Sequence, residues 1–373
     1  MNILFCIGRN YRDFNPLNQF AQRFAKEYLG VIYQMVFCDS LESESNRDST
    51  LKFCLDCATN LLILAPKSDF NQCLEVIQKT QKIESLTKTP VMIGEERVKR
   101  LEYAINGETR RVWLLDLECI FTNQTESQAN AQSFISAQFE GSKNVHKMFL
   151  YLLGLDAASA KMLLCGIAKD FEIDLEILNT DSNLEILSAT GNEASLKEFA
   201  KIIQLTFTHK IFPSFNLAQN VISLLTERGL KLTTAESCTG GLIAYWLTKE
   251  SGASAVFDGG VISYANAIKE SWLEVSSEHL ESFGAVSEAV VREMLEGALK
   301  LSGADFALAT SGIAGPSGGS INKPIGTVFI GAKSRKGVEI IERLHFKGDR
   351  NYIQEQATLY AYLLFLRIFF SDY

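Results

Sequence analysis

The chain has 373 residues, of which 47% are hydrophobic and 21% charged, so it is long enough for several packed domains, and three are expected. The formal net charge of −8 argues against a nucleic-acid partner, because such binding depends on clustered lysine and arginine. The sequence does not open with the pattern of a secretory signal. Eight unevenly spaced cysteines are typical of reduced thiols, which predicts a cytoplasmic protein.

Residues 1 to about 140 alternate short apolar runs, beginning with NILFCIG, with segments of helical periodicity. This alternation predicts a parallel sheet covered by helices. Cys54 and Cys57 form the one closely spaced cysteine pair, within a helical segment. Since neither a second pair nor a histidine follows nearby, both are predicted to be core cysteines and not a redox or metal site.

Residues 145 to about 212 predict a small α+β unit. Two helices (158–171 and 193–207) and two strands (174–180 and 184–190) are expected there. A boundary near Pro213 follows from glycine usage, since 8 of the 25 glycines come before residue 216 and 17 after it. The glycine-rich part is expected to wrap a ligand.

The part after Asn216 predicts an α/β domain whose special residues lie where strands end. We expect a helix ending at Gly229, a strand over 230–237, a helix beginning near Cys238, and a strand over 259–265. Ser287 is the expected N-cap of the next helix. Three strands over 305–311, 326–334 and 338–346 precede a terminal helix. The apolar run Leu359 to Phe370 contains Arg367 and is too short to span a membrane, so this helix is expected to be buried.

The turn Thr234 to Gly241 (TAESCTGG) joins an apolar strand to a helix and presents Ser237 beside free helix N–H groups, which can hold an oxyanion. Ser237 is therefore a candidate nucleophile, although Ser237 or Thr239 as a simple helix cap is the plainer reading. A base is needed. The four histidines lie outside the glycine-rich turns, whereas a desolvated lysine can serve.

The segment GGVISYANAIK places Tyr264 and Lys269 five residues apart after a strand end. Lys269 is the candidate base, with Tyr264 relaying the proton or orienting the amine. The alternative is that neither has a catalytic role, with Tyr264 a half-buried aromatic side chain and Lys269 a solvated surface charge.

Two further elements suit an anion. The loop from Thr310 to Gly319 (TSGIAGPSGG) offers consecutive N–H groups and hydroxyls, and Gly348-Asp349-Arg350 precedes the last helix. Arg350 could bind phosphate bidentately, and Asp349 could cap the helix. A plain loop and a solvated arginine remain the alternatives.

These blocks, together with FGAVSE and KPIGTV, resemble in order the C-terminal domain of the CinA family (competence/damage-inducible protein) over about 155 residues. The resemblance implies a nicotinamide-nucleotide amidase that hydrolyses nicotinamide mononucleotide to nicotinate mononucleotide and ammonia in pyridine nucleotide salvage, with no metal or other cofactor. It implies Ser237, Tyr264 and Lys269 as the catalytic residues. On this basis we expect the N–H groups of Thr239 and Gly240 to hold the oxyanion. The residues expected to bind substrate are Thr310, Ser311, Gly312, Gly315 and Arg350.

Full-length CinA proteins also carry a molybdopterin-binding-like domain and a small KH-like domain. The expected division is therefore multidomain α/β: residues 1–143 as a molybdopterin-binding-like α/β domain, 144–213 as a KH-like α+β domain and 214–373 as the α/β amidase domain. The first is expected to be degenerate, because Gly8-Arg9-Asn10 and Ala65-Pro66-Lys67-Ser68-Asp69 stand where the family has an acidic glycine turn and a glycine-rich loop with paired aspartates. The second lacks the basic Gly-x-x-Gly loop that clamps RNA.

Two other functions stay open. One is a bifunctional enzyme whose N-terminal domain cleaves ADP-ribose, and the other is a pyridine-nucleotide-binding protein without turnover. The expected partner is a small nucleotide, without nucleic acid or membrane, and a homo-oligomer is expected.

Overall fold

The computed structural model describes residues 1–8, 11–12, 15–38, 44–66, 69–81, 87–93, 96–105, 108–116, 146–178, 184–207 and 209–372. The chain forms two compact units. One comprises Met1–Ser127 with Lys347–Tyr352, and the other Gln128–Phe346 with Ile353–Tyr373. Three separate sheets form within them, with six, four and five strands. This confirms the expected mixed α/β class with several sheets.

The first sheet has the order β2-β1-β3-β6-β5-β4. Its strands are β1 (Asn2–Ile7), β2 (Gln34–Cys38), β3 (Asn60–Ala65), β4 (Thr87–Ile93), β5 (Glu96–Ile105) and β6 (Glu108–Asp116). Strands β2, β1, β3 and β6 are parallel, as predicted, but β5 and β4 extend the sheet antiparallel. The expectation of a parallel sheet is therefore wrong at this edge, because two short connections let β4, β5 and β6 pair as hairpins.

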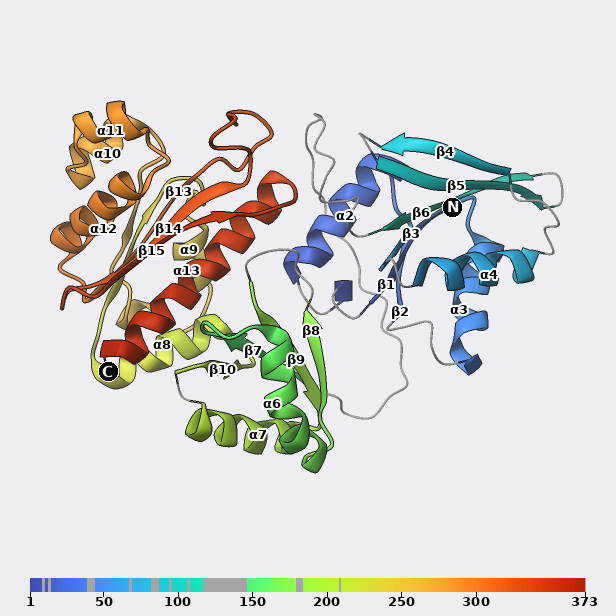
Figure 1. Cartoon of the computed structure of the whole chain (residues 1–373), viewed down its shortest axis with the longest axis horizontal. Helices are drawn as coiled ribbons and strands as arrows, with labels where there is room; N and C mark the ends of the chain where they lie inside the picture. The colour runs from blue at the N-terminus through green and yellow to red at the C-terminus, as the bar shows by residue number, and fades with distance from the viewer. Residues whose placement is uncertain are drawn as a thin grey trace. The chain divides into compact units, whose positions relative to one another are not determined.

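Helices α2 (Asn15–Leu29), α3 (Glu44–Cys57) and α4 (Phe70–Gln81) cover this sheet, with α3 and α4 side by side and α2 on the opposite face (Figure 1). Cys54 is fully buried in the core, as predicted, whereas Cys57 is exposed and that part of the prediction is wrong. The two lie three residues apart at the end of α3, and only Cys54 faces the sheet. Arg9, Asn10, Lys67 and Ser68, which carry the expected departure from the family pattern, lie outside the described residues.

The second sheet is antiparallel, in the order β10-β7-β9-β8, and α6 and α7 pack on it (Figure 1). Its elements are β7 (His146–Leu152), α6 (Ala157–Asp170), β8 (Asp174–Leu178), β9 (Ile186–Gly191), α7 (Glu193–Thr206) and β10 (Ile211–Ser214). Both predicted helices and both predicted strands are present. Strands β7 and β10 were not predicted. They pair with each other although they lie at the two ends of this stretch of sequence.

The third sheet has the order β12-β11-β13-β14-β15. Its strands are β11 (Leu232–Glu236), β12 (Gly260–Ile262), β13 (Phe306–Gly312), β14 (Thr327–Ser334) and β15 (Glu339–His345). β12, β11 and β13 are parallel, and β14 and β15 continue antiparallel. Four of the five strands lie within the predicted ranges, and β13 ends at Gly312, one residue beyond the predicted 305–311.

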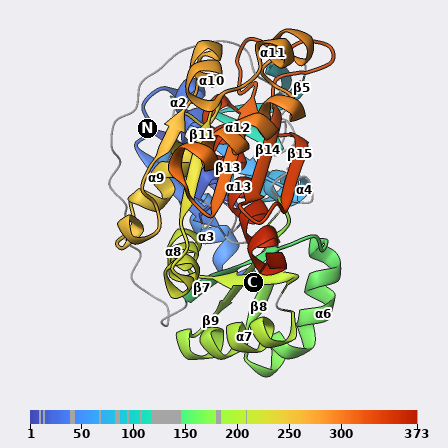
Figure 2. The ribbon, with the colours of Figure 1, turned by 90° about the vertical axis from the view of Figure 1, so that its left-hand side faces the viewer.

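Helices cover both faces of this sheet (Figures 1 and 2). They are α8 (Leu217–Arg228), α9 (Leu242–Thr248), α10 (Asn266–Leu273), α11 (Ser277–Phe283), α12 (Glu288–Ser302) and α13 (Arg350–Asp372), with a short 3₁₀ turn, η2 (Ala253–Ala255). On one face α12 packs against the strands, and α10 and α11 pack against α12. On the other face the hydroxyl of Tyr362 in α13 donates to the carbonyl of Ile243 in α9 at 2.7 Å.

The terminal helix α13 is buried, as predicted. Leu364, Phe365 and Phe369 are fully enclosed, and the last two pack against Phe306 of β13. In the described part of the chain no helix is both long and apolar enough to cross a membrane. The apolar side chains of α13 therefore belong to the core of the domain.

Candidate active site

The carboxyl ends of three parallel strands meet at one edge of the third sheet. Glu236, the last residue of β11, pairs in register with Ile262 at the end of β12 and with Thr310 near the end of β13. Strands that run parallel bring the segments following them to the same edge, where ligands of α/β sheets bind. The three motifs singled out in the sequence follow these strand ends.

Ser237 and Lys269 meet at this edge. Lys269 Nζ lies 3.1 Å from Ser237 Oγ, although the two residues are 32 positions apart. The amine also donates to the carbonyl oxygen of Ser263 at 2.6 Å and to that of Tyr264 at 3.3 Å. Three oxygen atoms therefore hold the end of a side chain that is only 1% exposed. The alternative of a solvated lysine does not hold.

Burial lowers the pKa of Lys269 below its ordinary value, and the neighbouring Cys238 thiol opposes part of that shift. The charged ammonium is disfavoured because it has left water. A lysine in this condition has a larger neutral fraction near neutral pH, and its lone pair can accept a proton. The pair thus has the geometry and the electrostatics of a nucleophile with its base.

Tyr264 contributes its main chain to the site. Its carbonyl oxygen accepts from Lys269 at 3.3 Å, and the expected role in relaying the proton or orienting the amine stays a prediction. The residue is 62% exposed, so its ring lies largely in solvent.

The turn that carries Ser237 is longer than predicted. The helix α9 begins at Leu242 and not near Cys238, because Gly240 and Gly241 adopt positive φ angles of 62° and 98° that interrupt the helical path. The N–H of Ser237 donates to the carbonyl of Thr310 at 3.0 Å, which fixes the turn to β13.

The two expected oxyanion donors differ in this turn. The Gly240 N–H donates to the Ser237 carbonyl at 3.2 Å and is occupied. Among the described residues, none accepts a hydrogen bond from the Thr239 N–H. Of these two N–H groups, that of Thr239 is therefore the one left to donate to an oxyanion.

Glu236 is the functional candidate that the sequence analysis passed over. It lies within the quoted TAESCTGG segment, directly before Ser237, and is fully buried. Its carboxylate accepts four hydrogen bonds, from the Thr239 hydroxyl and from the N–H groups of Gly241, Ile243 and Ala244. An acidic residue five positions before Gly241, the glycine that precedes the first residue of α9, was the available signal.

The glycine-rich loop begins with buried residues. Thr310 is fully buried, with its hydroxyl 2.7 Å from that of Thr239, and Ser311 donates its hydroxyl to the Ala285 carbonyl at 2.7 Å. Gly312 ends β13, where a Cβ would lie 2.7 Å from the Val328 side chain. Gly315 has a φ of 84°, and the loop becomes exposed from Pro316 onward. Thr310 and Ser311 therefore hold the loop in place.

Arg350 begins α13, and Asp349 caps this helix by accepting from the Tyr352 N–H at 2.7 Å, as predicted. Asp349 also pairs with Arg23 of α2 at 2.8 Å. Four residues after Arg350, Gln354 donates its side-chain amide to the carbonyl of Cys238 at 2.6 Å. One helical turn thus separates Arg350 from a residue that contacts the Ser237 turn.

The comparisons with known proteins cover the same part of the chain. A family model described as the CinA C-terminal domain matches residues 214–369. A nicotinamide-nucleotide amidohydrolase PncC of Enterobacter agglomerans is 45% identical over 156 residues, which are 42% of this chain and 95% of that protein. The protein of the same name in Escherichia coli K12 is 48% identical over 145 residues, 39% of this chain and 88% of that protein.

A competence-damage inducible protein of Caldicellulosiruptor saccharolyticus is 41% identical over 191 residues, which are 51% of this chain but only 46% of that protein. The match therefore spans less than half the length of this relative. A solved structure of the competence damage-inducible protein A from Klebsiella pneumoniae shows 41% identity, covers 42% of this chain and 96% of its own, and has a TM-score of 0.40. The chain belongs to the CinA family, to which its residues 214–369 match as the C-terminal domain.

Proposed function

We propose that the chain is a nicotinamide-nucleotide amidase, which hydrolyses the carboxamide of nicotinamide mononucleotide to the acid and ammonia. The observation that carries this proposal is the 3.1 Å contact between Ser237 Oγ and the buried amine of Lys269. Two relatives that the chain covers almost entirely are named for this activity, which supports the choice of substrate.

The first step uses Lys269 in its neutral form. In this form the two amine hydrogens suffice for the carbonyls of Ser263 and Tyr264, which leaves the lone pair to accept from the third neighbour, Ser237 Oγ, 3.1 Å away. The hydroxyl proton passes to Nζ as Oγ attacks the carboxamide carbon. The Thr239 N–H stabilises the oxyanion, a contribution of about 3 kcal/mol for one such donor.

In the second step Lys269 acts as the acid. The ammonium of Lys269 returns the proton to the departing nitrogen, ammonia leaves, and the acyl group remains on Ser237 as an ester. A water molecule then loses a proton to Lys269 and attacks the ester, which releases the pyridine carboxylate and restores the Ser237 hydroxyl.

The nucleotide phosphate is assigned to Arg350 and to the loop from Thr310 to Gly315. Arg350 offers a planar fork of donors that suits phosphate. Buried Thr310 and Ser311 hold the loop, Gly312 leaves no side chain to collide with Val328, and Gly315 adopts a φ of 84°. Tyr264 is exposed, and its carbonyl oxygen accepts from Lys269.

The test is ammonia release from nicotinamide mononucleotide by the purified chain, with and without a chelator, beside a Ser237→Ala variant. We expect chelator-resistant release that the variant abolishes. Tight binding of the nucleotide without release of ammonia would instead select a pyridine-nucleotide-binding protein. A cytoplasmic location and a homo-oligomer stay predictions.

A further inference from the structure

The carboxylate of Glu236 is fully enclosed next to the nucleophile. One oxygen accepts from the Thr239 hydroxyl at 2.7 Å and from the N–H groups of Gly241 at 3.0 Å and Ile243 at 3.1 Å, and the other accepts from the Ala244 N–H at 2.9 Å. The three backbone groups can only donate, so the side chain takes part as an acceptor-only carboxylate.

This carboxylate ties the turn to the first residues of α9. Glu236 itself is held by the sheet, since its carbonyl accepts from the Ser263 N–H at 2.8 Å. Its side chain reaches over Ser237 to residues three to eight positions later. Glu236 thus fixes the start of the turn through its main chain and the end of the turn through its side chain.

The hydrogen bonds that start at Glu236 continue to Thr310 of β13. Thr239 donates its proton to Glu236, so the hydroxyl of Thr310, 2.7 Å away, must donate to Thr239. The direction of both hydrogen bonds is set by the carboxylate. The Ser237 N–H in turn donates to the Thr310 carbonyl. Ser237 is therefore held from two sides. Its own N–H binds Thr310 of β13, and Thr239, two residues later, binds both Glu236 and Thr310.

The N–H groups of Gly241, Ile243 and Ala244 are used by Glu236 and are closed to a substrate anion. We propose that Glu236 is a positioning residue that holds Ser237 and the Thr239 N–H in the geometry that attack by Ser237 requires. Displacement of a reacting group by 1 Å can lower the rate by about a hundredfold, so this control is relevant to catalysis. The inference rests on the proposed Ser237–Lys269 pair.

The experiment compares Glu236→Gln with the wild-type chain by two readouts. One is ammonia release from nicotinamide mononucleotide. The other is labelling by a fluorophosphonate, in which Ser237 Oγ bonds to phosphorus, fluoride leaves, and the serine proton passes to Lys269. The glutamine keeps an oxygen for three donors but turns an amide toward the Ala244 N–H. We expect kcat and the labelling rate to fall about tenfold or more, and KM to stay within about threefold.

Asp305→Asn is the matched control. Asp305 accepts from the Lys231 N–H at 2.8 Å at the opposite ends of β11 and β13, so it undergoes the same chemical change away from the serine. We expect its kcat to equal that of the wild type. Glu236→Ala, if folded, should lose at least as much kcat as Glu236→Gln, since all four donors lose their acceptor.

A folded Glu236→Gln chain with wild-type kcat and labelling would overturn the inference. So would a fall in kcat with a shifted pH dependence, because Glu236 would then act on Lys269 through charge and not on Ser237 through position. Labelling that falls in the variant while the wild type releases no ammonia would refute the proposed substrate and keep the inference. A wild-type chain that neither labels nor releases ammonia would overturn both.

Discussion

At Lys269 a cationic side chain ends among three oxygen atoms in a buried environment. Burial favours its neutral form, and the neutral form is the one that can accept the proton of Ser237. Burial of an ionisable group costs stability, so the proposed base lowers the free energy of unfolding of the domain.

The lowered pKa of Lys269 predicts the pH dependence of catalysis. We expect kcat/KM for nicotinamide mononucleotide to rise with pH as Lys269 loses its proton, with a midpoint below about 10.4, the ordinary value for lysine. The measurement is a pH profile of ammonia release. A midpoint at or above the ordinary lysine value would contradict the assigned base.

Lys269→Arg tests the same residue directly. A guanidinium keeps its proton throughout this range, so it cannot act as a base. We expect kcat to fall by about a hundredfold or more. Lys249→Arg, at an exposed lysine after α9, is the control and should leave the rate unchanged. Turnover by Lys269→Arg at the wild-type rate would remove Lys269 from the mechanism.

At the scale of elements, α10 carries Lys269 and depends on a close contact with α12. A Cβ at Gly297 of α12 would lie 2.1 Å from the carbonyl oxygen of Leu273, the last residue of α10. No other residue type fits this crossing without a shift of backbone. The position of the base therefore depends on a glycine on another helix.

Gly297→Ala should consequently destabilise the domain by about 1–3 kcal/mol, the usual cost of overpacking. Chemical denaturation measures this loss, and a reduced kcat should accompany it. Gly166→Ala on α6 is the matched control, because a Cβ there meets nothing within 4 Å. That change should stabilise its helix by about 0.5–1 kcal/mol. Equal effects at both positions would contradict the packing argument.

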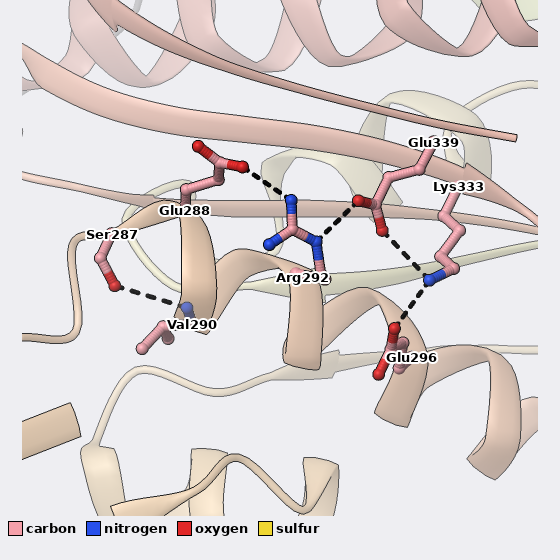
Figure 3. Close-up of polar contacts among 7 residues, drawn as sticks. All are labelled: Ser287, Glu288, Val290, Arg292, Glu296, Lys333 and Glu339. Atoms are coloured by element: carbon pink, nitrogen blue, oxygen red, sulfur yellow. Dashed lines mark hydrogen bonds and ion pairs between the residues drawn. The ribbon is translucent and has the colours of Figure 1, made fainter. Parts of the chain in front are cut away.

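A charge network attaches α12 to the strands β14 and β15 (Figure 3). Glu339 accepts from Arg292 at 2.8 Å and from Lys333 at 3.1 Å, while Arg292 also pairs with Glu288 and Lys333 with Glu296. Burial would raise the pKa of Glu339, but these two partners hold it below its ordinary value.

The direction of this shift gives a prediction for stability. A lowered carboxyl pKa contributes stability above the ordinary value of 4.5, and the contribution is lost as the pH falls through the lowered value. Glu339→Gln should lower the free energy of unfolding by about 0.5–1 kcal/mol at neutral pH and less in acid. Chemical denaturation at neutral and at acid pH measures this loss of free energy of unfolding, and Glu281→Gln, at an exposed position, is the control. An equal loss at both would contradict the ion-pair explanation.

At the scale of the whole molecule, three hydrophobic cores form on three sheets, and Ser237 and Lys269, the proposed catalytic pair, lie at the edge of the third. The boundaries 1–143, 144–213 and 214–373 stay predictions. In the described part of the chain no group of three or more potential metal ligands occurs.

We expect the fragment 214–373 to release ammonia from nicotinamide mononucleotide with a kcat within about threefold of the full chain, since both members of the Ser237–Lys269 pair lie within it. The fragment 1–212 should release no AMP from ADP-ribose when magnesium is present. AMP release by this fragment would establish the bifunctional alternative, and an inactive but folded 214–373 fragment would show that the N-terminal part contributes to the site.

The sequence by itself determined most helices and strands and their order, because apolar periodicity, caps such as Ser287 and stops such as Gly229 are local properties. It also picked out Ser237 and Lys269 by motif. It missed β7 and β10, whose pairing joins distant segments, and the antiparallel edge formed by β4 and β5.

Only the tertiary structure decided how the candidate residues are arranged. The contact between Ser237 and Lys269 exists because parallel strands end at one edge of a sheet, and the lowered pKa of Lys269 exists because α10 buries the amine there. The role of Glu236 depends on N–H groups of the following helix, whose direction is set by two glycines at positive φ. Burial and hydrogen-bond partners depend on packing between distant segments, and a local pattern of residues does not contain them.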